Sequence, residues 1–316
     1  MLALSLYPDV ILTLLVGFVL AWPLGRYMAR VYLGRPSLLD RILNPIERSI
    51  YALLGTNPRR MMGWKEYAAS LLLCNLAALV LVFVLLTEQG ALPWNAWAVP
   101  GMHWDLALHT SSAFVTNTDY QHYVPESSAS LLASLLGLQM LMFLSAASGL
   151  AAVVGLIRGF IRRDGTVGNV WVDLLRGTTR ILLPISLLGA GLLALASVPQ
   201  TWHQTVTIYP MTGGSQSLPL GPYASWDSIE FLGSNGGGFT AANAGHPFQN
   251  PTAVTNALSV LLMMLIPFAT PFMFGAMVRR PGEAWPYLGV ILSIFLVALG
   301  LFLYFQGANT FLRGIP

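Results

Sequence analysis

The chain has 316 residues, of which 55% are hydrophobic and only 9% are charged. Soluble domains carry about 25% charged residues, so this composition excludes an ordinary soluble enzyme and predicts an all-α polytopic membrane protein. The single cysteine, Cys74, excludes an intrachain disulfide. Because no GxxxxGK[ST] motif is present, ATP-driven transport would need a second chain to bind the nucleotide.

Six apolar stretches are long enough to cross a bilayer, which takes about 20 helical residues. No basic residue precedes the first stretch, and Arg26 and Arg30 follow it, which is the reverse of a cleavable signal peptide. We therefore expect an uncleaved first helix with its N-terminus outside. The expected spans are approximately Val10–Tyr27, Tyr67–Leu86, Ser128–Ile157, Leu174–Ala196, Ala253–Val278 and Trp285–Phe305.

The basic residues cluster in alternate connections between these spans. Eight basic residues lie between the first and second spans. Five, including Arg163, lie between the third and fourth spans, and two lie between the fifth and sixth. The positive-inside rule places all of these in the cytoplasm and leaves only Arg313 outside. The pI of about 9.1 then reflects topology and contact with anionic lipids, and predicts no nucleic-acid partner.

Between the first two spans, residues 36–54 have an amphipathic pattern. Apolar residues recur there at helical spacing, with charged residues among them, which predicts a helix on the membrane surface. A docking site for a partner is the alternative. The apolar residues are Leu38, Leu39, Ile42, Leu43, Ile46 and Ile50.

The order of helix, outer loop, helix and basic inner loop occurs twice, which indicates an internal repeat. We expect residues 1–60 to form the N-terminal helix and the cytoplasmic amphipathic segment, 61–165 the first repeat, and 166–280 the second. Residues 281–316 would begin a third repeat, which suggests a truncated parent protein.

The two outward loops carry the candidate chemistry. Each opens on Trp-Asp, is long enough for a short half-helix, and ends in a run of small polar or glycine residues. The two loops are Trp104–Thr118 and Trp226–Phe239. A half-helix that enters the membrane and returns as bare backbone is a way to coordinate a dehydrated cation. The second loop offers Ser234, Asn235, Gly236, Gly237 and Gly238, where glycine reaches positive φ without steric cost. A flexible turn is the alternative.

The first loop offers Val115, Thr116, Asn117 and Thr118, and contains no glycine. Threonine oxygens and backbone carbonyls can ligate a hard cation, and asparagine tolerates left-handed backbone angles. Asp119 and Gln121 follow immediately, and an acidic group at a pore mouth would concentrate cations. A solvated or hydrogen-bonded loop residue is the alternative for Asp119.

Other polar residues give weaker signals. The small residues of Ser145–Gly149 would permit close helix packing or line an ion path. The five histidines lie in outer-loop regions without metal-ligand spacing, so we expect no structural metal. The acidic residues are not paired within a span, so a proton relay is unsupported.

Several long motifs closely resemble the KdpA family, the potassium-binding, channel-like subunits of bacterial Kdp potassium-transporting ATPases. The resemblance extends along essentially the whole chain. The motifs are FVTNTD at 114–119, FLSAASG at 143–149, NVWVDLL at 169–175, LGP at 220–222, LGSNGGGF at 232–239 and HPFQNPT at 246–252.

The resemblance implies four helix–pore-loop–helix repeats around a pseudo-fourfold filter, preceded by one extra helix. Val115–Thr118 and Ser234–Gly238 would form two filter quadrants, and Gln121 would lie near the outer mouth. The complex would take up K⁺ across the bacterial plasma (inner) membrane. The ion would pass to the P-type ATPase subunit KdpB, which would bind ATP and Mg²⁺, and KdpC and KdpF would be further partners.

Three features depart from the family pattern. Ser234 stands where threonine is usual, and Thr240 and Ala241 replace a more usual Phe-Asn behind the filter. The third and fourth pore loops are absent, so we expect that this chain alone does not bind or conduct potassium selectively. Two other hypotheses stay open: a stand-alone channel or symporter half-subunit that dimerises, and a non-transporting remnant.

Overall fold

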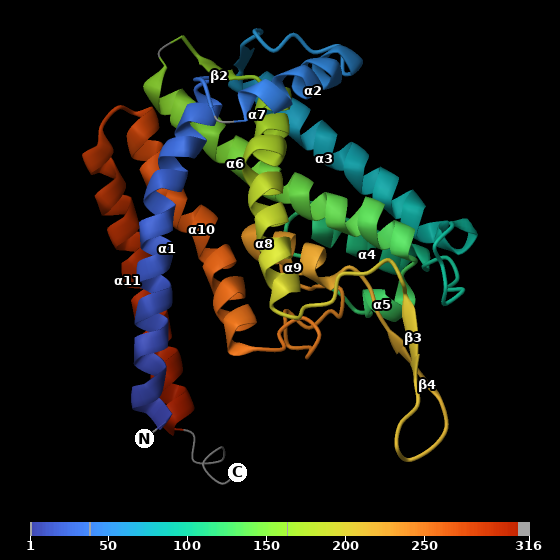
Figure 1. Ribbon diagram of the computed structural model, residues 1–316. Coiled ribbons are helices and arrows are strands. Elements are labelled where there is room, and N and C mark those ends of the chain that lie inside the picture. The colour runs from blue at the N-terminus through green and yellow to red at the C-terminus, as the bar shows by residue number, and fades with distance from the viewer. Residues whose placement is uncertain (1, 38, 163, 309–316) are drawn as a thin grey trace. The chain divides into compact units, whose positions relative to one another are not determined.

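The computed structural model describes residues 2–37, 39–162 and 164–308, so Leu38, Arg163 and Arg313 lie outside the described part. The chain is mostly helical, with two small two-stranded sheets (Figure 1). The predicted all-α fold is confirmed, and six helical segments of the described chain are long and apolar enough to span a membrane. They are Ile11–Tyr32, Trp64–Thr87, Ala133–Ile161, Val170–Leu195, Ala253–Met277 and Pro281–Phe305.

The chain forms two compact units, Met1–Leu33 with Met264–Pro316, and Gly34–Met263. The first unit contains α1 (Leu2–Tyr32), the later part of α10 (Ala253–Met277) and α11 (Ala284–Ala308). Gly25 lets α1 approach α10 closely, because a Cβ atom there would lie 2.6 Å from Cβ of Phe272. The ring of Phe18 packs on that of Phe268, at a centroid distance of 5.7 Å.

The second unit contains both candidate loops. Its spans are α3 (Trp64–Thr87), α6 (Met140–Ile161), and α7 (Val170–Arg176) followed by α8 (Leu183–Leu195). π-helical turns precede α6 at Ala133–Gln139 and join α7 to α8 at Gly177–Leu182. Two short helices, α4 (Trp104–Val115) and α9 (Tyr223–Leu232), lie among these spans, and α5 (Pro125–Ser128) follows α4.

A buried polar cluster joins three spans of this unit. Arg158 of α6 pairs with Asp173 of α7 at 2.5 Å, and Tyr67 of α3 donates hydrogen bonds to Asp173 and to the carbonyl of Ala151. The strands β1 (Met62–Gly63) and β2 (Thr166–Gly168) pair nearby. Because a buried charge must be paired, this cluster fixes the register of the three helices.

The predicted amphipathic helix is α2 (Asp40–Leu53), and its polar face packs on the protein. Arg180 forms ion pairs with Asp40 and Glu47 and donates to Asn44 at 2.8 Å. Ile42, Ile46 and Leu53 are exposed on the helix instead. The helix itself is therefore confirmed, and its contact with a membrane surface stays a prediction.

A β-hairpin between α8 and α9 was not predicted from the sequence. Its strands are β3 (Thr205–Ile208) and β4 (Gln216–Pro219), with Thr205 opposite Pro219 and Ile208 opposite Gln216. Gly213 and Gly214 have positive φ in the connecting turn. Figure 1 shows the hairpin projecting away from the helices of its unit.

Candidate functional site

The first loop is built on α4, which has 12 residues. At 1.5 Å per residue the helix is about 18 Å long, too short to cross a hydrocarbon core of about 30 Å. It ends in a cap in which the backbone N–H groups of Thr118 and Asp119 both donate to the carbonyl of Ala113, at 2.9 and 3.1 Å. Asn117 takes the left-handed conformation that this cap requires, with φ of 62°.

The second loop is built on the 10-residue helix α9 and ends in the same way. The N–H of Asn235 donates to the carbonyl of Glu230 at 2.9 Å, and Ser234 has φ of 52°. Thr118 and Asn235 therefore occupy equivalent places, as do Asn117 and Ser234. Both predicted half-helices are present, and each turns back into bare backbone at its C-terminal end.

The Trp-Asp pairs are not equivalent, which corrects the sequence interpretation. Trp104 is the first residue of α4 and is 61% exposed, whereas Trp226 is the fourth residue of α9 and is fully buried. The second half-helix starts earlier, at Tyr223 after Pro222. The two loops therefore match at their C-terminal caps and differ at their helix starts.

Side-chain hydrogen bonds bring the two loops together. The Asn117 amide nitrogen donates to the carbonyls of Gly233 and Ser234, at 3.1 and 3.2 Å. Its amide oxygen accepts from Asn235 at 2.8 Å and from the hydroxyl of Ser145 at 2.8 Å. Both the amide nitrogen and the amide oxygen of Asn117 thus form hydrogen bonds within the protein. The remaining group of Asn117 that could bind an ion is its backbone carbonyl.

Several backbone carbonyls of the loops lack a hydrogen-bond donor. Within the described residues, nothing donates to the carbonyl oxygens of Asn117 and Thr118, or to those of Asn235 and Gly236. By contrast, the carbonyl of Gly237 accepts from the N–H of Asn243 at 2.8 Å, and that of Gly238 accepts from the N–H of Ala241. Each loop therefore has two free carbonyls, and the two loops contact each other. Of these, the carbonyls of Thr118 and Asn235 occupy equivalent places in the two caps.

The hydroxyls of the first loop are turned toward the protein. The Thr116 hydroxyl donates to the carbonyl of Ser112 at 2.8 Å and lies 3.2 Å from the Thr118 hydroxyl. Backbone oxygens of Thr116 and Thr118 are therefore better placed as free ligands than their side chains. Whether Val115 contributes stays a prediction from the sequence.

The glycine run has the predicted backbone conformation. Gly236, Gly237 and Gly238 have φ of 99°, 75° and 106°, where any side chain would be strained. Close approach requires glycine as well. A Cβ atom on Gly237 would lie 2.6 Å from the carbonyl oxygen of Asp119, and one on Gly238 would lie 2.7 Å from Oε2 of Glu230.

Three buried carboxyl groups surround the glycine run. Asp119, Asp227 and Glu230 are each at most 1% exposed, and none forms an ion pair with a described basic residue. Burial raises the pKa of Asp119 to about 8. Burial also raises the pKa values of Asp227 and Glu230. A cation nearby would favour the charged forms.

The predicted pore-mouth residues are not alike. Asp119 is buried, which contradicts the alternative of a solvated loop residue. Gln121 lies against the glycine run, because a Cβ atom on Gly237 would overlap its Oε1 atom. Gln121 therefore contacts the backbone of the other loop, and its role at a pore mouth stays a prediction.

The packing behind the second loop accommodates Thr240. Its hydroxyl donates to Oε1 of Gln249, and Nε2 of Gln249 donates to Asp227 at 2.6 Å. A polar network thus occupies the region behind the glycine run. No local pattern predicts this pairing, because Gln249 and Asp227 lie 22 positions apart.

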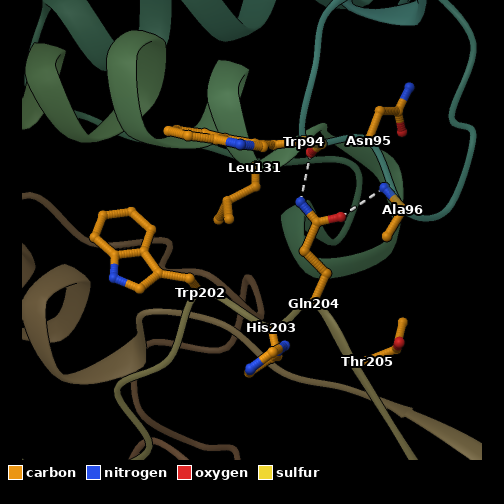
Figure 2. Close-up of a pocket in the computed structure, with 8 residues that line it drawn as sticks. All are labelled: Trp94, Asn95, Ala96, Leu131, Trp202, His203, Gln204 and Thr205. Atoms are coloured by element: carbon orange, nitrogen blue, oxygen red, sulfur yellow. Dashed lines mark hydrogen bonds between the residues drawn. The ribbon is translucent and has the colours of Figure 1, made fainter.

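A separate open pocket of about 640 Å³ lies where β3 meets the segment before α4 (Figure 2). Gln204 lines it: its amide nitrogen donates to the carbonyl of Trp94 at 2.5 Å, and its amide oxygen accepts from the N–H of Ala96 at 2.6 Å. No predicted ion-binding residue lines this pocket, so it is distinct from the paired loops. Its lining residues are Trp94, Asn95, Ala96, Leu131, Trp202, His203, Gln204 and Thr205.

Comparison with known proteins gives a consistent result. Residues 11–313 match the family described as KdpA, potassium-transporting ATPase A subunit. A relative from a Nostoc species is 45% identical over 287 residues, covering 90% of this chain and 51% of the relative. A relative from Laribacter hongkongensis is 45% identical over 292 residues, covering 92% and 52%. One from Pseudomonas aeruginosa is 45% identical over 282 residues, covering 89% and 50%.

All three relatives are named as the potassium-binding subunit of a potassium-transporting ATPase. The chain spans about half the length of these curated relatives. The family match covers nearly all of the chain and includes both loops. The protein is a multi-pass membrane protein, and it belongs to the KdpA family.

Proposed function

We propose that this chain binds extracytoplasmic K⁺ and forms part of the selectivity filter of an ATP-driven potassium uptake complex. The observation that carries this proposal is the pair of matching helix caps, which present free carbonyls on two bridged loops. Backbone carbonyls replace the hydration shell of K⁺ in selective filters. The C-terminal end of a helix is also electronegative, which favours a cation beside each cap.

The proposed ligands come from both loops. They are Val115, Thr116, Asn117 and Thr118 from the first, and Ser234, Asn235, Gly236, Gly237 and Gly238 from the second. Asp119 and Gln121 would lie near the entrance. Two such loops supply half of a pseudo-fourfold site, so two further loops are needed to complete the coordination of the ion.

We also propose partners and a location for this chain. This chain would pass K⁺ to a KdpB-like P-type ATPase subunit, which would bind ATP and Mg²⁺, with KdpC-like and KdpF-like subunits in the complex. It would lie in the bacterial inner membrane with its N-terminus outside. The names of the relatives support an ATPase partner, since each is called a subunit of a potassium-transporting ATPase.

The test is to express the native transporter that contains this chain in a bacterium lacking its own potassium uptake systems. We expect growth in low-potassium medium, and ATP hydrolysis by isolated membranes that K⁺ stimulates and Na⁺ does not. Growth and hydrolysis that do not depend on K⁺ would contradict the proposal.

A further inference from the structure

Ser145 of α6 lies where the two loops meet. Its hydroxyl donates to the amide oxygen of Asn117 at 2.8 Å and accepts from the amide nitrogen of Asn235 at 3.1 Å. Asn235 also donates to Asn117 at 2.8 Å, so the three side chains close a ring of hydrogen bonds. One residue comes from the first loop, one from the second, and one from a spanning helix.

The chemistry of this ring suits a hydroxyl at position 145. A serine hydroxyl has one donor and two acceptor positions, so it can donate to one amide and accept from the other at the same time. Ser145 is 4% exposed and Asn235 is 6% exposed, so water has little access to replace a lost bond. Leaving a buried amide unpaired costs more than the bond itself contributes.

The ring is adjacent to the free carbonyls in both loops. Asn117 and Asn235 each contribute one of those carbonyls, and Thr118 and Gly236 follow them directly. Only two rotatable bonds separate each asparagine amide from its backbone, so hydrogen bonds that hold the amides restrain the adjacent carbonyls. The spacing between the two pairs of oxygens is therefore tied to the position of the Ser145 hydroxyl.

The scaffold that holds Ser145 is rigid. A Cβ atom added to Gly233 would lie 3.1 Å from Cβ of Ala146, so α6 packs closely against the end of α9. Ser148, one turn along α6, bonds to Asn75 of α3 at 3.1 Å instead of to either loop. The small-residue cluster therefore serves packing, and Ser145 is its member that reaches both loops.

We propose that Ser145 is a positioning residue of the potassium site, which sets the separation of the carbonyl pairs of the two loops and so the preference for K⁺ over smaller cations. This inference rests on the proposed function of the loops. Ser145 does not contact the ion in this proposal; it acts through Asn117 and Asn235. Filters discriminate by ligand number and spacing, so a looser pair of loops would accept Na⁺ more readily.

The test uses the native transporter containing this chain, with K⁺-stimulated and Na⁺-stimulated ATP hydrolysis measured for wild type, Ser145→Ala, Ser145→Thr and Ser148→Ala. We expect Ser145→Ala to raise the KM for K⁺ about tenfold, as loss of one buried hydrogen-bond partner implies, and to lower the K⁺/Na⁺ ratio. The kcat should change little. Ser145→Thr keeps the hydroxyl and should restore most of the K⁺ preference.

Ser148→Ala is the matched control, because it removes a hydroxyl from the same helix without touching either loop. A Ser145→Ala variant with the ion preference of Ser148→Ala would overturn the inference. If the Ser145→Ala variant does not assemble, Ser145→Cys is tested instead, because cysteine has nearly the same shape and is only a weak hydrogen-bond donor. An unchanged KM for K⁺ in that variant would also overturn the inference. A wild-type transporter without K⁺ dependence would contradict the proposed function as well.

Discussion

The first and second loops reach one backbone geometry from different sequences. Both helices end in a cap closed by an N–H that reaches back five residues, to Ala113 in the first loop and Glu230 in the second. The first loop uses Asn117 at its left-handed position and no glycine. The second uses Ser234 there and continues into three glycines with positive φ.

The difference lies in what supports each cap. In the first loop the Thr116 hydroxyl bonds within its own helix end, to Ser112, and the Asn117 amide bonds across to the backbone of the second loop. The second is supported from behind by buried Trp226 and Glu230, and its glycines leave room for the first loop. The cap therefore determines where the carbonyls lie, and the glycines of the second loop allow both the positive φ values and the close approach of neighbouring groups.

The two Trp-Asp tryptophans should differ most in their effect on stability. Trp226→Ala removes a fully buried side chain and should lower the free energy of unfolding by about 3–5 kcal/mol. Trp104→Ala, at an exposed position, should change it by less than about 0.5 kcal/mol. Unfolding of the purified protein in detergent checks both variants. Equal losses would mean that the first loop is supported from behind as the second is.

The glycine run should tolerate substitution least at Gly237. Alanine there combines positive φ with a 2.6 Å approach to the Asp119 carbonyl, so it must displace the first loop. The KM of the transporter for K⁺ should rise about 100-fold, from strain and overlap together.

Gly213→Ala is the control for Gly237→Ala. Gly213 also has positive φ, 90°, but a Cβ atom there meets nothing within 4 Å. Its KM should stay at the wild-type value, even though the hairpin turn is strained. A similar KM for both variants would show that the contact between the loops does not matter.

Much of the fold was predictable because a helix that crosses a lipid bilayer needs about 20 consecutive, mainly apolar residues. Six long apolar stretches gave the spans, and the glycine run gave the positive φ values now observed at Gly236–Gly238. Both the apolar stretches and the glycine run are local patterns of neighbouring residues, so they can be recognised in a single sequence. The resemblance to the family added the pairing of the two loops.

The rest depended on contacts between distant residues. The bond from Asn117 to Gly233 spans 116 positions, and that from Ser145 to Asn235 spans 90, so periodicity could not predict either. The Trp-Asp pairing was wrong because two identical residues need not share a place in the helix. The hairpin was missed because its strands are short and exposed.

Equivalent cap positions should respond unequally to loss of the side chain. Asn117→Ala removes the bridge to Gly233, Ser234 and Asn235, and should raise the KM for K⁺ about tenfold. Ser234→Ala should change the KM less than about twofold, because its exposed side chain forms no hydrogen bond to the described residues. Both positions have positive φ, which asparagine tolerates better than serine or alanine, so the backbone cost of alanine is somewhat larger at Asn117. Equal KM values would show that conformation, and not the bridge, sets the site.

The smallest expected effect concerns the second tie between the loops. The hydroxyl of Tyr223 at the start of α9 donates to the carboxylate of Glu126 at 2.5 Å. Tyr223→Phe keeps the buried ring and loses only this bond, so it should lower the free energy of unfolding by about 1 kcal/mol. Glu126 is half-buried and can turn to water, which limits the loss.

Tyr209→Phe in the exposed hairpin is its control, because that ring is 79% exposed and should be neutral. Thermal unfolding of both variants measures the difference. If Tyr223→Phe is also neutral while Ser145→Ala alters ion preference, the bond from Tyr223 to Glu126 does not contribute to the spacing of the carbonyls. If Tyr223→Phe changes the K⁺ preference too, the helix starts, where the two loops differ most, also control the spacing of the carbonyls.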